Sequence, residues 1–399
     1  MNKNWRWLPA GIVPAVIVAA SVSGTAVAEA QPQLPAKTAQ ELLEFVATST
    51  DDAYSGTVEQ SSNLGLPDVG MATPSGGTSS NDPTSLALEL LTGEHTARVF
   101  VDGPDRARVQ VLDELAQRDV IVNSTDAWSY DSATNEVRHA ALPDKDAAKA
   151  ELEARLQQKV ADHPELQDLP RTPAELAELF LTEIDPSTEV AVDGTSRVAD
   201  RSAYELRLTP EDPATLIGTI SVSIDSETGV PLGVAVQAKG QEDAAFDAAF
   251  SDVDFSAPDA TIFDFTPPPG ATVIEAPTVD EARALVDGKD SDLPAVPTAK
   301  PTVIGEGWST IVELPAGSAS LMGIAPGSGE AGMGEIMEIK PGMDPEQVAG
   351  AQALLEQALT DVDGGRALQT SLASVLITDD GRILMGAVGI DQLVAAARQ

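Results

Sequence analysis

Residues 204–265 read YELRLTPEDPATLIGTISVSIDSETGVPLGVAVQAKGQEDAAFDAAFSDVDFSAPDATIFDF, and apolar and polar side chains alternate along much of this stretch. Leu206 and Leu208 alternate with charged residues, and Val234 and Val236 alternate with small or polar ones. A period of two places successive side chains on opposite faces of a β-strand. The turn sequence at 225–229 reverses the chain between two such runs. The stretch predicts antiparallel strands with one apolar face, which is either covered by helices or open to an apolar guest.

The same alternation extends upstream, at residues 96–102, 106–112 and 118–130. Helices are predicted around these strands. The capping box of Thr38 and Glu41 begins one helix, and a second capping box with proline at the first helical position begins another at residues 172–184. The expected fold class is α+β, an antiparallel sheet with helices and a small α+β module after it.

Four segments follow from composition and pattern. Residues 1–28 form a signal peptide or an N-terminal anchor, and residues 35–286 form the domain that contains these strands. Residues 287–302 are a proline-rich linker, and residues 303–399 form the C-terminal module. Within that module, Asp380-Gly381 between two apolar runs predicts a β-hairpin, and a helix is expected from Asp391 to the end.

The N-terminus has the pattern of an export signal. Lys3 and Arg6 precede an apolar run from Leu8 to Val22, and small residues at Ala26–Ala30 suit a signal peptidase. Cleavage and retention as an anchor both remain open. In either case we expect the rest of the chain to be extracytoplasmic, either secreted or attached to the outer face of the cytoplasmic membrane.

The charge of the chain excludes one class of partner. Its 399 residues carry 24 Lys and Arg against 63 Asp and Glu, a formal net charge of -39. Nucleic-acid binding is not expected, because phosphates would be repelled. The chain has no cysteine, which excludes disulfides, thiolate metal sites and a lipidated cysteine.

No residue pattern indicates catalysis. His95, His139 and His163 stand in unrelated contexts and are expected to be exposed, and neither a GxSxG nor an HExxH sequence occurs. Residues 327–332 fit GxGxxG but follow a proline, not a strand. The acidic turn at 225–229 could hold a cation only loosely. We therefore predict no enzyme, no catalytic or metal-ligating residues and no cofactor.

The order of elements resembles the LolA/LolB/RseB superfamily of lipoprotein carriers and sensors over about residues 35–275. The match is one of architecture and has no catalytic motif. It rests on these segments: Leu42-Leu43 before Tyr54–Val58, Arg106–Arg108, Asp126–Asp131, Tyr204–Pro210, Ile224–Pro231 and Phe263–Gly270.

The resemblance implies that the 35–286 domain is a curved antiparallel half-barrel lidded by helices, whose concave apolar face shelters an acyl chain of a lipid or acylated lipoprotein. Lid residues would come from the 172–184 helix: Leu176, Leu179 and Phe180. The candidate cavity-lining residues are Val99, Val101, Val109, Val111, Leu206, Leu208, Ile220, Val222, Val234 and Val236. An ordinary closed core under packed helices would produce the same pattern.

Two functions remain. The first is an exported, non-catalytic carrier or chaperone for a lipid or acylated lipoprotein. The alternative is an RseB-like extracytoplasmic sensor or regulator that binds a membrane protein, which the two-part layout favours. A structural role in the envelope is a third possibility. The sequence departs from the minimal carriers by about a hundred residues after the linker and by a long polar loop at 66–85.

Overall fold

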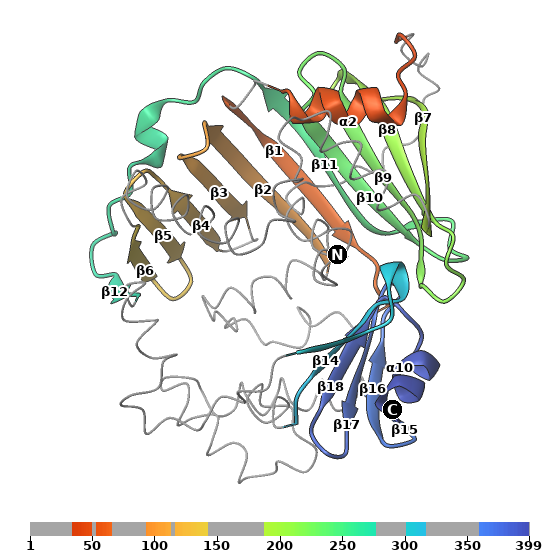
Figure 1. Ribbon diagram of the computed structural model, residues 1–399. Coiled ribbons are helices and arrows are strands. Elements are labelled where there is room, and N and C mark those ends of the chain that lie inside the picture. The colour runs from red at the N-terminus through yellow and green to blue at the C-terminus, as the bar shows by residue number, and fades with distance from the viewer. Residues whose placement is uncertain are drawn as a thin grey trace, which may run out of the picture.

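The computed structural model describes residues 34–49, 53–65, 93–112, 116–142, 187–276, 301–316 and 359–398. These residues form two sheets, one of twelve strands and one of six. Figure 1 shows the larger sheet as a wide, open curve, with the smaller sheet at one end of it. The predicted linker, the 172–184 helix and the N-terminal segment lie largely or wholly outside the described residues.

The large sheet is antiparallel except at one edge. Its strand order is β12-β6-β5-β4-β3-β2-β1-β11-β10-β9-β8-β7, so the chain builds one half, crosses over, and builds the other half back toward β1. The strands are β1 Ala53–Ser62, β2 Gly93–Asp102, β3 Ala107–Leu112, β4 Gln117–Val122, β5 Asp126–Asp131, β6 Glu136–Ala141, β7 Thr188–Val198, β8 Arg201–Pro210, β9 Ile217–Asp225, β10 Pro231–Ala238, β11 Ala244–Asp254 and β12 Thr272–Glu275.

Helix α2 (Ala39–Ala47) lies on the inner side of this curve, across the β8–β11 half (Figure 1). Its predicted capping box is present, since the Thr38 side chain accepts from the Glu41 N–H and the Glu41 carboxylate accepts from the Thr38 N–H at 2.7 Å. Leu42 is fully buried in a cluster with Leu206 and Phe246. We call the face of the large sheet that carries α2 the inner face.

The opposite, outer face is covered near β3–β6 by the segment after β11. Short helix η5 (Ala260–Phe263) and Phe265 lie there, and the Phe265 ring is 5.5 Å from Trp128 and 5.9 Å from Tyr130. Trp128 and Tyr130 therefore pack against this segment on the outer face. The large sheet continues beyond Phe265, because β12 pairs in parallel with β6.

The small sheet has the order β13-β14-β18-β17-β16-β15. Helix α10 (Ile390–Ala397) packs on one face of it, where Leu376, Leu384 and Leu393 are fully buried. Its strands are β13 Thr302–Ile304, β14 Ile311–Leu314, β15 Thr360–Val362, β16 Gly365–Gln369, β17 Ser374–Thr378 and β18 Ile383–Gly386. Short helix η6 (Gly307–Ser309) lies between β13 and β14.

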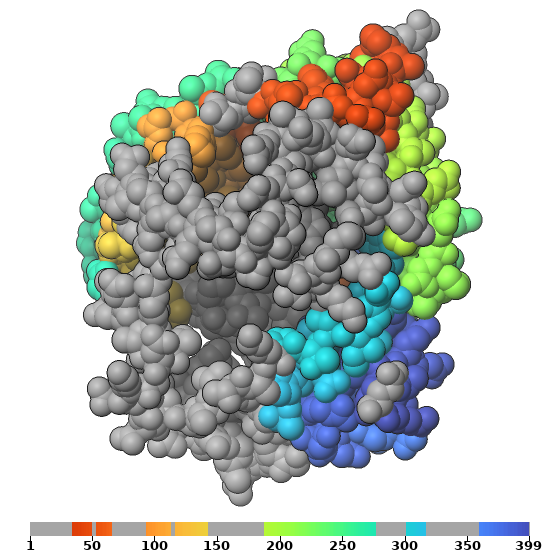
Figure 2. Space-filling model, viewed as in Figure 1, coloured from red at the N-terminus to blue at the C-terminus, as the bar shows by residue number. Residues whose placement is uncertain are grey.

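The two sheets meet along one rim of the large one. The Thr215 hydroxyl donates to the Ala387 carbonyl at 2.9 Å, and the Trp308 Nε1 donates to the Thr188 hydroxyl at 2.6 Å. Trp308 and Leu372 also pack against the cluster under α2. Figure 2 shows the cyan and blue segments directly against the green strands. The small sheet thus shares an apolar cluster with the large one.

Candidate functional site

All ten predicted cavity-lining residues lie on the inner face. Directly paired residues of neighbouring strands point to the same side of a sheet. Val99 pairs with Val109, and Leu206 pairs with Val222, which pairs with Val234. The remaining pairs extend the same two rows: Ala97 with Val111, Val101 with Ala107, Leu208 with Ile220, and Ile220 with Val236. The alternation in the sequence therefore specified a single continuous face.

Six of the ten belong to the cluster that α2 covers. They are Leu206, Leu208, Ile220, Val222, Val234 and Val236, and they pack with Leu42, Phe246 and Ala248. Leu206, Leu208, Ile220 and Val236 are each less than a tenth exposed. In the described residues this half of the inner face has the closed-core arrangement that the sequence left open.

The other four, Val99, Val101, Val109 and Val111, lie on β2 and β3 in a second cluster with Val58 and Phe250. None of the described helices contributes to this cluster. Val120 and Val122 on β4 continue the face, because they pair with Val109 and Ala107. We call the following residues the apolar strip: Val58, Ala97, Val99, Val101, Ala107, Val109, Val111, Val120 and Val122.

The apolar strip is buried in one part and accessible in another. Val58, Ala97, Val99 and Val111 are each less than a tenth exposed. Val120 is 37% exposed, one of the few large apolar side chains exposed to this extent among the described residues, and Val109 is half-buried. Val120 and Val122 were missed as lining residues. The alternation at 118–122 does place both valines on one face of a strand. The sequence did not show whether that face is the inner or the outer one.

An aromatic group closes one end of the apolar strip. The Tyr54 and Phe250 rings meet edge to face at 6.0 Å, and burial raises the pKa of Tyr54. The Phe250 ring lies over Gly56, where an added Cβ would stand 2.7 Å from its Cδ1. Gly56 is therefore required for this ring position, which sets the local shape of the inner face.

Gln60 is the polar residue of this region. It pairs with Ala248 on β11 and His95 on β2, so its side chain shares the inner face with Val58. Gln60 is 9% exposed, and neither its Nε2 nor its Oε1 has a hydrogen-bond partner. Sequence reasoning missed it, because a glutamine in an alternating strand is normally assigned to the solvated face.

The predicted lid residues Leu176, Leu179 and Phe180 lie outside the described residues. Within the described ranges no helix is long and apolar enough to cross a membrane. The same ranges contain no group of three or more acidic or histidine side chains placed to hold a metal ion.

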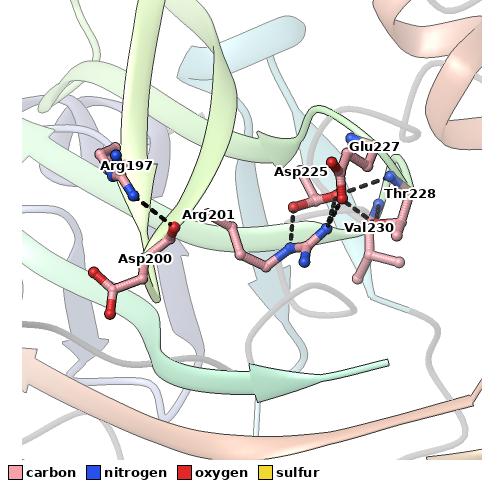
Figure 3. A network of polar contacts seen from close by, with 7 residues as sticks. All are labelled: Arg197, Asp200, Arg201, Asp225, Glu227, Thr228 and Val230. Carbon is pink, nitrogen blue, oxygen red and sulfur yellow. Dashed lines mark hydrogen bonds and ion pairs between the residues drawn. The ribbon is translucent and has the colours of Figure 1, made fainter. Parts of the chain in front are cut away.

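The acidic turn at 225–229 has an internal cation partner. Asp225 is 1% exposed at its side chain and accepts from Arg201 Nε at 2.5 Å and Nη2 at 3.0 Å, and from the Thr228 N–H at 2.8 Å (Figure 3). Burial alone would raise the pKa of Asp225, but Arg201 and the turn donors of Thr228 and Glu227 bring it below its usual value. The arrangement holds the β9–β10 hairpin together.

His139 is not the exposed residue that was expected. Its side chain is 16% exposed and stacks on Trp128 with ring centroids 3.8 Å apart. Its two ring nitrogens lie 2.7 Å from carboxylate oxygens of Asp126 and Glu275. The hydrogen bond to Asp126 is the largest cause that raises the pKa of His139, with Glu275 adding to it against desolvation. His139 thus ties β12 to the edge of the sheet.

The stability that His139 provides should depend on pH. Its pKa is raised in the folded state, so its contribution is complete below the unfolded value near 6.5 and disappears as pH rises through the higher folded value. We expect the stability difference between the wild type and His139→Asn, measured by urea unfolding, to shrink from pH 6 to pH 9. Glu275→Gln should weaken this dependence. A difference that stays constant over that range would contradict the assignment.

No protein-family model matches the chain, and no curated protein matches its sequence. Solved structures do. MucB of Pseudomonas aeruginosa, solved in complex with MucA, has a TM-score of 0.40 and 15% identity, and the match covers 90% of this chain and 96% of MucB. A LolA superfamily protein from Nitrosomonas europaea has a TM-score of 0.23 and 10% identity over 58% of this chain and 99% of that chain.

The solved structures that are similar to this chain thus include a MucB and a LolA superfamily protein, as the resemblance predicts. Another, an uncharacterized conserved protein from Thermus thermophilus, has a TM-score of 0.32 and 13% identity over 60% of this chain and 99% of that chain.

Proposed function

We propose that the protein is an exported, non-catalytic carrier that holds an acyl chain, of a lipid or of an acylated lipoprotein, against the apolar strip. The observation that supports this most is the composition of the strip. Nine apolar side chains are contiguous across β1–β4, and no described helix packs on them, whereas α2 covers the other half of the same face.

The affinity would come from apolar area of the strip and of the guest that leaves water together. Apolar area removed from water contributes about 25 cal/mol per Å². An acyl chain that covers a few hundred Å² would therefore gain several kcal/mol, from which the cost of association is subtracted. In this proposal Leu176, Leu179 and Phe180 help to cover the bound chain, and the export signal places the carrier outside the cytoplasmic membrane.

The alternative, a sensor that binds a membrane protein, is favoured by one feature. Trp308 and Leu372 of the second sheet pack into the cluster under α2, beside the apolar strip. A guest on the inner face would therefore be close to the residues that position the second sheet. This arrangement suits a protein that reports occupancy to a partner.

The test uses a pair of matched variants. Val120 on the apolar strip is 37% exposed, and Val273 on β12 is 44% exposed, so aspartate at either position should leave folding intact. We expect Val120→Asp to weaken binding of a fluorescent fatty-acyl probe at least about tenfold, because a charge would be buried under the chain. Val273→Asp should bind like the wild type.

Native mass spectrometry of the full chain, purified gently from its own host, completes this test. An acyl-containing ligand on the wild type and its loss from Val120→Asp support the carrier. Equal weakening by both variants, or no uptake of the probe by the wild type, contradicts it. Recovery of one membrane protein in stoichiometric amount without an acyl ligand supports the sensor instead.

A further inference from the structure

We propose that Gln60 binds the ester carbonyl of a neutral, polyol-headed acyl lipid, such as a monoacylglycerol, and so selects esters over chains that lack a carbonyl. This inference rests on the proposed function, because it assigns the head group of the same guest. Its starting point is that Gln60 is the only described residue with two buried side-chain polar atoms that lack a partner.

An unpartnered amide on an apolar face is unfavourable by itself. Its Nε2 can donate two hydrogen bonds and its Oε1 can accept two, and burial without any of them has a free-energy cost. A bound guest that supplies a hydrogen-bond acceptor for Nε2 and a donor for Oε1 would offset this cost. The position of Gln60 fits this, since it follows Val58 on the inner face and adjoins Ala248 of the cluster under α2.

The location indicates where the head of the guest would lie. On the inner face Gln60 stands at the boundary between the apolar strip, with Val58 and Ala97, and the closed half, with Ala248 and Phe246. A chain that covers the strip would reach this boundary at one of its ends. The amide would meet the first polar atoms of the guest there.

The chemistry of the surroundings selects a neutral head. The nearest inner-face neighbours of Gln60 along and across the strands are Val58, Ser62, Ala248 and His95, none of which is lysine or arginine. A free carboxylate would be buried there without a permanent cation among these described neighbours, which is strongly unfavourable. An ester carbonyl accepts from Nε2 without charge, and a neighbouring glycerol hydroxyl can donate to Oε1.

The test compares two lipids that differ only at the carbonyl: monopalmitoylglycerol and its hexadecyl ether. The wild type should bind the ester about tenfold more tightly, the size expected for one buried hydrogen bond to an otherwise unpaired group. Gln60→Leu should abolish the preference: it should weaken binding of the ester more than that of the ether, which keeps the glycerol hydroxyls but lacks the carbonyl. It should also raise Tm, because two unpartnered polar atoms are removed.

A matched variant controls for the substitution itself. Gln237 on β10 is bonded to the Thr219 hydroxyl at 2.7 Å and to the Glu242 carbonyl at 2.8 Å. Gln237→Leu should lower Tm and keep the preference for the ester. If the wild type binds both lipids equally, or Gln60→Leu keeps the preference, the role of Gln60 is refuted while the carrier stands. If the wild type binds neither lipid, both proposals fail.

Discussion

Replacing Asp225 by alanine will lower the free energy of unfolding by about 3 kcal/mol, near the lower end of the range for a broken buried ion pair. The carboxylate is almost fully buried, and its removal leaves Arg201 with Glu227, whose side chain is 79% exposed. The N–H groups of Glu227 and Thr228 lose their acceptor at the same time. Urea unfolding of the two proteins at pH 7 measures the difference.

The control is the ion pair of Asp193 and Arg207, whose side chains are 49% and 42% exposed. Asp193→Ala should lower the stability by less than about 1 kcal/mol, because solvent screens an exposed pair. If Asp225→Ala and Asp193→Ala lowered the stability equally, burial would not be the reason for the large effect expected at Asp225. The contribution of Asp225 should also vanish in acid, since its lowered pKa means that the stability is lost only as pH falls through the folded value.

The strands of the large sheet could be predicted because each carries its own signal. The alternation of Leu206, Leu208, Ile220 and Val222 is local, and the register of β8 and β9 then follows from the side that has to be buried. Strand β12 could not be found in this way. It has four exposed residues, and its parallel partner β6 is more than a hundred residues earlier in the chain.

The candidate site was predictable only as a face. Alternation placed ten residues on one side of the sheet, but buried and accessible positions on that side have the same sequence pattern. Leu206 is buried under α2 and Val99 is buried on the apolar strip, whereas Val109 is only half-buried, and this difference in burial arises from tertiary packing. Gln60 and His139 could not be assigned from the sequence either, because their polar side chains suggested exposure. His139 finds a partner on the distant strand β12, whereas the buried amide of Gln60 has no partner.

Truncation of Leu42 to alanine will lower the free energy of unfolding by about 2–5 kcal/mol, the usual range for a buried leucine. Leu42 is fully buried and joins α2 to Leu206 and Phe246. The helix also touches the β9–β10 turn, where the Ser49 hydroxyl donates to the Thr228 carbonyl at 2.7 Å. Thermal or urea unfolding of the full chain measures the loss.

Leu43→Ala is the matched control, because Leu43 is only partly buried on the same helix and the substitution changes helix propensity equally. It should lower the stability clearly less, and an equal loss would contradict the packing of α2. The acyl affinity of the Leu42→Ala variant also tests where on the inner face the acyl chain binds. If the acyl chain lies on the apolar strip, Leu42→Ala destabilises the protein but leaves acyl affinity unchanged at temperatures where the variant is folded. If the chain binds under α2, the same variant changes that affinity.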